Sequence, residues 1–156
     1  MADNDFLGIG MKFPPAIDEA TGRFKTSSLV DSVRESLYII LMTQRNERLL
    51  RPGFGADLEA HTFMDVNATQ LSMLQRDLLE TIGMQEPRIT DVTINMDQDI
   101  KNGALIIDLS YAIISENVKD NLVFPFYLNA EKPEEMPEEY ESGEYETEGQ
   151  FVDEES

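Results

Sequence analysis

Hydrophobic residues recur with the period of an α-helix in the first half of the chain, after a serine at position 27 or 28 that can cap a helix. The apolar positions fall three or four residues apart on one face. They are Leu29, Val33, Leu37, Ile40 and Leu41. The opposite face carries Arg34 and Glu35, as expected beside solvent. This pattern predicts an amphipathic helix that runs to about Met42.

A second segment with the same period begins near Asn67. The Asn67 side chain can cap this helix, with Gln70 in the reciprocal position, and Gly83 is expected to end it. The apolar stripe consists of Leu71, Leu74, Leu78 and Ile82. We therefore expect a second amphipathic helix with one buried face.

The pattern changes from helical to alternating after residue 90, which is typical of strands with one buried face. The alternating apolar positions are Val92, Ile94 and Met96, and then Leu105, Ile107, Leu109, Tyr111 and Ile113. Residues 97–103 are expected to turn, and Asn102-Gly103 is a strong hairpin signal. A third strand is expected at 122–128, and Pro125 confines it to a sheet edge or a bulge because proline has no N–H to donate. The predicted fold class is α+β, with two main helices packed on a small antiparallel sheet.

The two ends of the chain differ from this central part. Residues 1–25 combine glycines and prolines with the apolar anchors Phe6, Leu7, Phe13 and Phe24, so we expect an irregular N-terminal arm before a domain at 26–130. Residues 131–156 carry twelve acidic side chains and one lysine, which is −11 of the net charge of −19. This acidic tail cannot fold alone, yet Met136, Tyr140, Tyr145 and Phe151 are spaced through it. We expect a partner to order it in an extended form; the alternative is a solvated tail.

The amino-acid composition limits which kinds of chemical site the chain can form. The chain has no cysteine and one histidine, His61, which excludes disulfides and zinc sites built from thiolates or imidazoles. It shows no membrane helix and no signal peptide, so we expect assembly in the cytoplasm without a membrane. Negative charge on both domain and tail disfavours nucleic acid. With no motif for a nucleophile or a phosphate, we predict a non-enzymatic protein that has no metal or cofactor and binds other proteins.

Two charged clusters are candidates for such contacts. Arg45, Arg48 and Arg51 place three positive charges within seven residues of an otherwise acidic domain. They either form a docking patch for an acidic partner, such as the tail of a neighbouring copy, or belong to surface ion pairs with Glu47 and other acids.

The second cluster is Glu86-Pro87-Arg88, between the second helix and the first strand. Pro87 disfavours a helical Glu86, so the chain leaves the helix extended and in a fixed direction. The two charges form either a corner held by salt bridges within the domain or a rigid docking element that loses little conformational entropy on binding. No second carboxylate or base can be tied to Glu86, so the sequence does not favour catalysis there.

Four stretches taken together resemble one family. They are FLGIGMKFP at 6–14, TGRF at 21–24, ILMTQRNERLLRPGFGADL at 40–58 and EPRIT at 86–90. Their order resembles the baseplate-wedge proteins of contractile injection machines, namely contractile-tailed phages, type VI secretion systems and phage-like particles. Asn46 stands where that family usually has a glycine before Glu47 and Arg48, and asparagine is the best substitute at a left-handed position.

The resemblance implies an assembly role. The domain would join the core bundle of the baseplate wedge and form the platform on which the sheath begins to polymerise, in several copies around a six-fold ring. Its partners would be other wedge proteins, the sheath protein, and inner tube or hub proteins. The motif residues that would bind them are Glu86, Pro87, Arg88, Glu47, Arg48 and Arg51.

An unpaired sheet edge agrees with this role, because sheath subunits of such machines connect by lending strands to one another. Val123, Phe124 and Phe126 of the predicted edge strand are therefore further candidates for partner binding. Two alternatives stay open: a peptidoglycan-degrading, lysozyme-like enzyme that uses Glu86, and an anti-adaptor that binds a response regulator. Which kind of machine the protein belongs to is also open.

Overall fold

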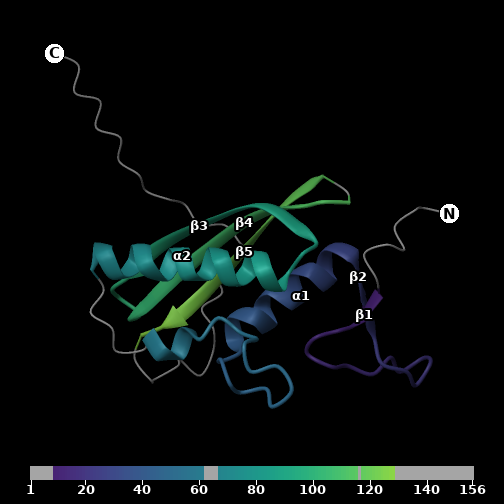
Figure 1. Ribbon diagram of the computed structural model, residues 1–156. Coiled ribbons are helices and arrows are strands. Elements are labelled where there is room, and N and C mark those ends of the chain that lie inside the picture. The colour runs from purple at the N-terminus through teal and green to yellow at the C-terminus, as the bar shows by residue number, and fades with distance from the viewer. Residues whose placement is uncertain (1–8, 62–66, 116, 129–156) are drawn as a thin grey trace.

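The computed structural model describes residues 9–61, 67–115 and 117–128 (Figure 1). Its elements are, in chain order, β1 (Ile9–Met11), β2 (Thr26–Ser28), α1 (Leu29–Met42), the 3-10 helix η2 (Leu58–His61), α2 (Ala68–Gln85), β3 (Ile89–Asp99), β4 (Ala104–Ile113) and β5 (Val118–Tyr127). The last three strands form one antiparallel sheet in the order β3-β4-β5. The predicted α+β class is confirmed.

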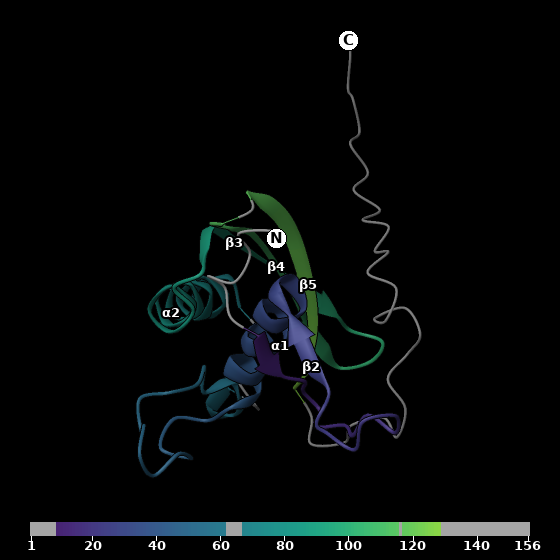
Figure 2. The same ribbon diagram turned by 90° about the vertical axis from the view of Figure 1, so that its right-hand side faces the viewer.

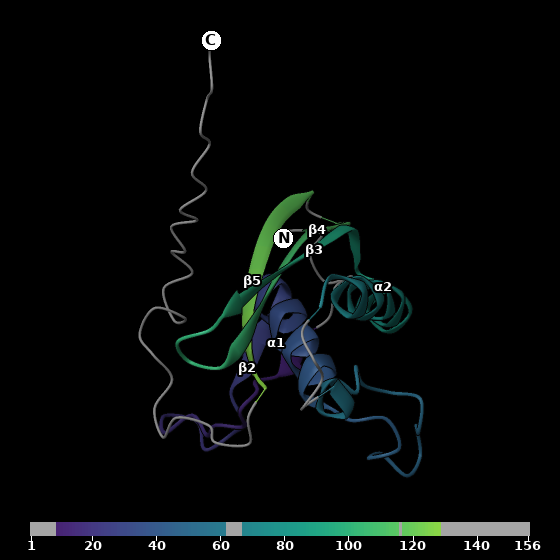
Figure 3. The same cartoon turned by 90° about the vertical axis from the view of Figure 1, so that its left-hand side faces the viewer.

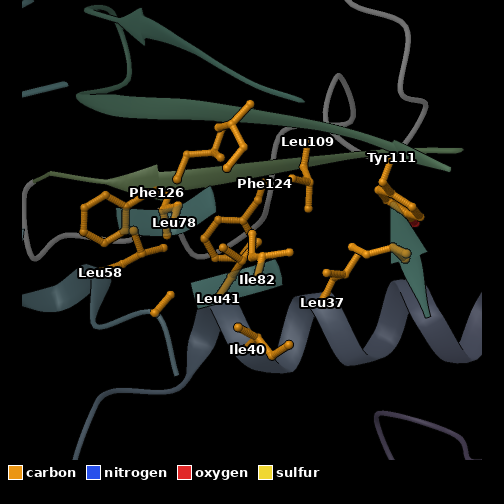
Figure 4. Packing of buried hydrophobic residues seen from close by; sticks show 14 of the residues in the cluster. Leu37, Ile40, Leu41, Leu58, Leu78, Ile82, Leu109, Tyr111, Phe124 and Phe126 are labelled. Atoms are coloured by element: carbon orange, nitrogen blue, oxygen red, sulfur yellow. The ribbon is translucent and has the colours of Figure 1, made fainter. Parts of the chain in front are cut away.

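Both main helices cover the same face of this sheet (Figures 2 and 3). Helix α2 lies beside β3, and α1 lies against β5, where the Tyr38 and Phe124 rings meet edge to face at 5.6 Å. Figure 4 shows the core between the layers, with Phe124 and Phe126 of β5 facing Leu41 of α1 and Ile82 of α2. Each fully buried side chain of this kind contributes roughly 1.5–3 kcal/mol to stability.

The periodic positions face the core as predicted. On α1, Val33, Leu37, Ile40 and Leu41 are buried, and on α2, Leu74, Leu78 and Ile82 are buried. Asn67 caps α2 by accepting a hydrogen bond from the Gln70 main-chain N–H at 2.9 Å. The reciprocal bond does not form, because the Gln70 side-chain oxygen has no hydrogen-bond partner.

Helix α2 does not end at Gly83, as the sequence suggests, but continues to Gln85. Gly83 therefore lies inside the helix rather than at its end. The end is set by Pro87, which disfavours a helical residue before it, and Glu86 accordingly has φ −122° and ψ 84°. The helix therefore runs up to the charged corner.

The strands also extend beyond their predicted bounds. β3 continues to Asp99 because Asp97, Gln98 and Asp99 pair with Ile106, Leu105 and Ala104 of β4, so the turn occupies 100–103 rather than 97–103. β5 begins at Val118, four residues before the predicted start, and is an edge strand, as Pro125 indicates.

The short strand β1 of the N-terminal arm pairs with β2, at the start of the following domain, and the sequence pattern predicts neither strand. Phe13 holds the arm to α1 through a ring contact with Tyr38 at 6.2 Å, whereas Phe24 is 60% exposed. Phe6 and Leu7, like Met136, Tyr140, Tyr145 and Phe151 of the tail, lie outside the described residues. None of the described helices is long and apolar enough to cross a membrane.

Candidate docking site

The corner between α2 and β3 is held by an ion pair inside the domain. Glu86 is only 2% exposed. Arg88 donates to both of its carboxylate oxygens, from Nε at 2.6 Å and from Nη2 at 2.7 Å, which is the strong bidentate geometry. Arg88 also donates from Nη1 to the Ser32 hydroxyl of α1 at 3.3 Å. The charges of the corner therefore face each other and α1, and Arg48 takes no part in this pair.

The surroundings of Glu86 favour its charged form. Burial alone would raise the pKa of Glu86, but hydrogen bonds from Arg88 and Ser36 and the charge of Arg88 outweigh it and hold this pKa below its ordinary value. The carboxylate of Asp120 in β5 is stabilised in its charged form in the same way. Burial opposes its charge, while hydrogen bonds from Arg34 at 2.6 Å and Tyr111 at 2.8 Å lower the pKa of Asp120.

These shifts predict acid sensitivity. Because both pKa values lie below the ordinary 4.5 and 3.8, the two carboxylates contribute stability above those values that is lost as the pH falls through the folded-state values. The domain should therefore unfold at lower urea at about pH 3 than at about pH 7. Asp120→Asn should reduce this difference, whereas the exposed control Asp77→Asn should keep it. Equal acid sensitivity of Asp120→Asn and the unaltered protein would contradict the assignment to Asp120.

The connector, residues 43–57, is anchored at both helix ends. Gly55 has φ 109° and lies against the main chain of Thr43. The Gly55 N–H donates to the Gln85 side chain at 2.9 Å, and Gln85 donates to the Gly53 carbonyl at 3.0 Å. Asn46 adopts the left-handed conformation expected of it, with φ 67°. Gln85 therefore fixes the connector, which carries the arginine cluster, to the end of α2. Because Gln85 directly precedes Glu86, the arginine cluster and the corner are linked through this anchor.

The tip of the connector is exposed and carries both apolar and positive groups. Leu49 and Leu50 are 98% and 96% exposed. The Arg48 guanidinium lies 4.1 Å from the centre of the Phe54 ring, a cation–π distance. Within the described part of the chain, the salt bridges are those of Arg34 with Asp120 and Arg88 with Glu86. Arg48 and Arg51 of the connector form none, and Glu47 instead accepts a hydrogen bond from the Gln44 N–H.

The outer edge of β5 is the third candidate. The Leu128 N–H donates to the Gly103 carbonyl beyond the end of β4, so even-numbered residues of this strand direct their main-chain groups to β4. Odd-numbered residues direct theirs to the free edge, including Pro125, which has no N–H. The Phe124 and Phe126 side chains lie in the core, 5% and 8% exposed, and Val123 is half-buried on the other face of the sheet.

The structure also reveals site residues that the sequence reading did not single out. Gln85 fastens the connector to α2, and Ser32 and Ser36 complete the surroundings of the corner. Gln85, Ser32 and Ser36 are identified as site residues only by the residues that they contact in the folded protein. The exposed pair Leu49-Leu50 did leave a signal, because two adjacent leucines stand in an otherwise polar turn.

The family model described as baseplate wedge protein gp25 matches residues 27–118, more than half of the chain. The chain belongs to this family of baseplate wedge proteins. The match includes α1, the connector, α2 and the corner, and it ends at the first residue of β5. The earlier resemblance is thereby confirmed, and the protein is a structural baseplate component of a phage tail or phage-like particle.

Two individual proteins are also similar to this chain. Baseplate wedge protein gp25 of Enterobacteria phage T4 is 25% identical over 83 residues, which cover 53% of this wedge protein and 63% of the phage protein, less than two thirds of its length. The crystal structure of a protein from Geobacter sulfurreducens, presented as a candidate tail lysozyme, matches with a TM-score of 0.62 and 36% identity over 68% of this chain and 96% of its own.

A chain in the six-fold symmetrised cryo-EM structure of the anti-feeding prophage baseplate matches with a TM-score of 0.54 over 81% of this wedge protein and 90% of its own length. At 23% identity this likeness shows a shared fold. The α+β arrangement of the described residues is therefore one that also occurs inside an assembled baseplate.

Proposed function

We propose that this wedge protein is a non-enzymatic platform for the first ring of the contractile sheath, and that a strand of the sheath protein adds to the free edge of β5. The main support is that β5 has β4 on one side and no strand on the other among the described residues. The connector contacts other wedge proteins, in several copies around a six-fold ring, and the corner holds the connector side of α2 in place. The fold match within a six-fold symmetrised baseplate supports this arrangement.

The other edge of the sheet is less suited to strand addition. The Gln75 side chain of α2 donates a hydrogen bond to the Ile94 carbonyl of β3, so part of this edge is already occupied. The register of β3 also shifts between Thr90 and Thr93, around Asp91 with φ 51°. Bulges and covering helices are common protections of sheet edges. β5 has neither within the described residues.

Pro125 limits where the added strand can pair. The odd-numbered residues face the free edge, and Pro125 interrupts their donors, so the continuous part of the edge is the stretch from Lys119 to Val123. The Asn121 N–H bonds to the neighbouring Asp120 carboxylate. Val123 therefore offers the donor nearest the middle of the strand that is available to a partner.

Val123→Pro tests this proposal. It removes the outward N–H while leaving the bonds to β4 intact, and outward positions of edge strands tolerate proline. Each lost main-chain hydrogen bond costs about 0.5–1.5 kcal/mol, repeated in every copy of the ring, so we expect particles with baseplates but without sheath. Electron microscopy of particles counts the sheathed fraction, and circular dichroism checks folding.

The matched control is Val123→Ala, which shortens the same side chain but keeps the N–H. We expect Val123→Ala to assemble normally sheathed particles. A folded Val123→Pro protein that also gives normally sheathed particles would refute strand addition at β5.

The lysozyme-like alternative receives less support from the site. A glycosidase needs one carboxyl group held protonated by a raised pKa, with a second carboxylate across a cleft. Glu86 has a lowered pKa, is buried, and is held in a bidentate pair with Arg88. An arginine-bound carboxylate is poorly suited to donate a proton, so we assign Glu86 a structural role in the platform.

A further inference from the structure

The tip of the connector, defined here as residues 47–51, is a surface that the sheath-binding role does not explain. It exposes the apolar side chains of Leu49 and Leu50 almost completely. Arg48 and Arg51 lie on either side of them and form no salt bridge with any described residue. Covering a leucine side chain is worth roughly 1.5–3 kcal/mol, so two adjacent exposed leucines strongly favour a bound apolar group.

The charges define what kind of ligand fits this surface. Arg48 and Arg51 outnumber Glu47 at the tip and attract acidic groups, and the exposed leucines attract apolar or aromatic ones. The neighbouring surface between the connector and α2 carries Asp77 and Glu80, which repel an acidic ligand. A ligand should therefore lie at the tip, and it should combine carboxylates with aromatic rings at short intervals.

The acidic tail of the same chain has this composition. Residues 131–156 contain twelve acidic side chains, with Tyr140, Tyr145 and Phe151 interspersed. The tail follows β5, whose Phe126 belongs to the same core cluster as Leu58. Figure 4 shows Phe126 of β5 beside Leu58, the first residue of η2 after the connector. A flexible chain spans roughly 5–6 Å times the square root of its residue number, which is about 20 Å for the 12 to 17 residues from Leu128 to Tyr140 and Tyr145.

We propose that the acidic tail binds the connector tip of its own chain in the free protein, with Tyr140 and Tyr145 against the two leucines and adjacent glutamates against the arginines. Tethering raises the effective concentration to the mM range, so weak contacts suffice. The bound tail shields the tip until other wedge proteins replace it. Only this replacement rests on the function proposed above; binding of the tail does not.

Paramagnetic NMR on the full chain tests this inference, because a chain without native cysteine accepts one nitroxide at Gln150→Cys. We expect the amide signals of residues 47–51 to lose roughly half or more of their intensity, as suits a tethered ligand at mM effective concentration. Arg48→Gln and Arg51→Gln together should abolish this loss. The control Arg23→Gln and Lys25→Gln removes the same charge from exposed positions elsewhere and should preserve it.

A mixed sample separates the two sources of the tail. When ¹⁵N-labelled chain without nitroxide is mixed with unlabelled chain carrying it, we expect no loss at residues 47–51. A loss in the mixture as large as in the single-chain sample would assign the tip to the tail of another copy and overturn the inference. An even loss over all amides, insensitive to the connector arginines, would overturn it in favour of a solvated tail. Because no baseplate is needed, these results do not depend on whether β5 recruits the sheath.

Discussion

Arg88→Ala is expected to lower the free energy of unfolding of the domain by about 3–5 kcal/mol, because it leaves a carboxylate buried without its partner. Glu86 is 2% exposed and its two oxygens both accept from Arg88. Urea unfolding followed by circular dichroism measures the loss.

Two further variants separate charge from geometry at this corner. Arg88→Lys keeps the charge but cannot form the bidentate pair, so it should fall between Arg88→Ala and the unaltered protein. The double variant Glu86→Leu with Arg88→Met should recover much of the stability, since replacing a buried ion pair by apolar groups is often neutral. If Arg88→Ala unfolded like the unaltered protein but failed to assemble, the corner would be a docking element and the structural role would be wrong.

Gly55→Ala is expected to destabilise the domain by about 3 kcal/mol or more, through backbone strain and a clash that no side-chain rotation relieves. A Cβ at Gly55 would lie 2.2 Å from the Thr43 carbonyl oxygen and 2.7 Å from its carbon, and the φ of 109° is itself unfavourable for alanine. Moving the connector away would break the bond from the Ala56 N–H to the Ile40 carbonyl of α1. Thermal unfolding should show the loss.

The matched control lies two residues away. A Cβ at Gly53 would have no neighbouring atom within 4 Å, so Gly53→Ala should change stability by no more than about 0.5 kcal/mol. Equal stability of the two variants would contradict the close approach of Gly55 to Thr43. Because Gln85 bonds to both glycine residues, the comparison also isolates the clash from any effect on that anchor.

Local patterns in the sequence were sufficient for the elements of this fold. The helical period placed α1 and α2, the alternating period placed β3 and β4, and Pro125 assigned β5 to an edge, because each signal depends on residues within a few positions of one another. Element bounds were less determined. Helix α2 continues through Gly83 because Pro87, four residues further on, sets its end. Strand β3 continues through Asp97 because Asp97 pairs with β4, which the local residue type does not indicate.

For the docking surfaces, too, some features were visible in the sequence and others came only from the tertiary structure. The sequence by itself determined the charges: the three arginines of the connector, the Glu86-Pro87-Arg88 corner and the acidic tail are all visible in it. Only the tertiary structure decided where those charges point. Glu86 faces Arg88 and α1, the connector leucines face solvent, and Gln75 leaves β5 rather than β3 as the open edge. The physical reason is that burial and hydrogen-bond partners depend on residues brought together from distant positions, which no local pattern specifies.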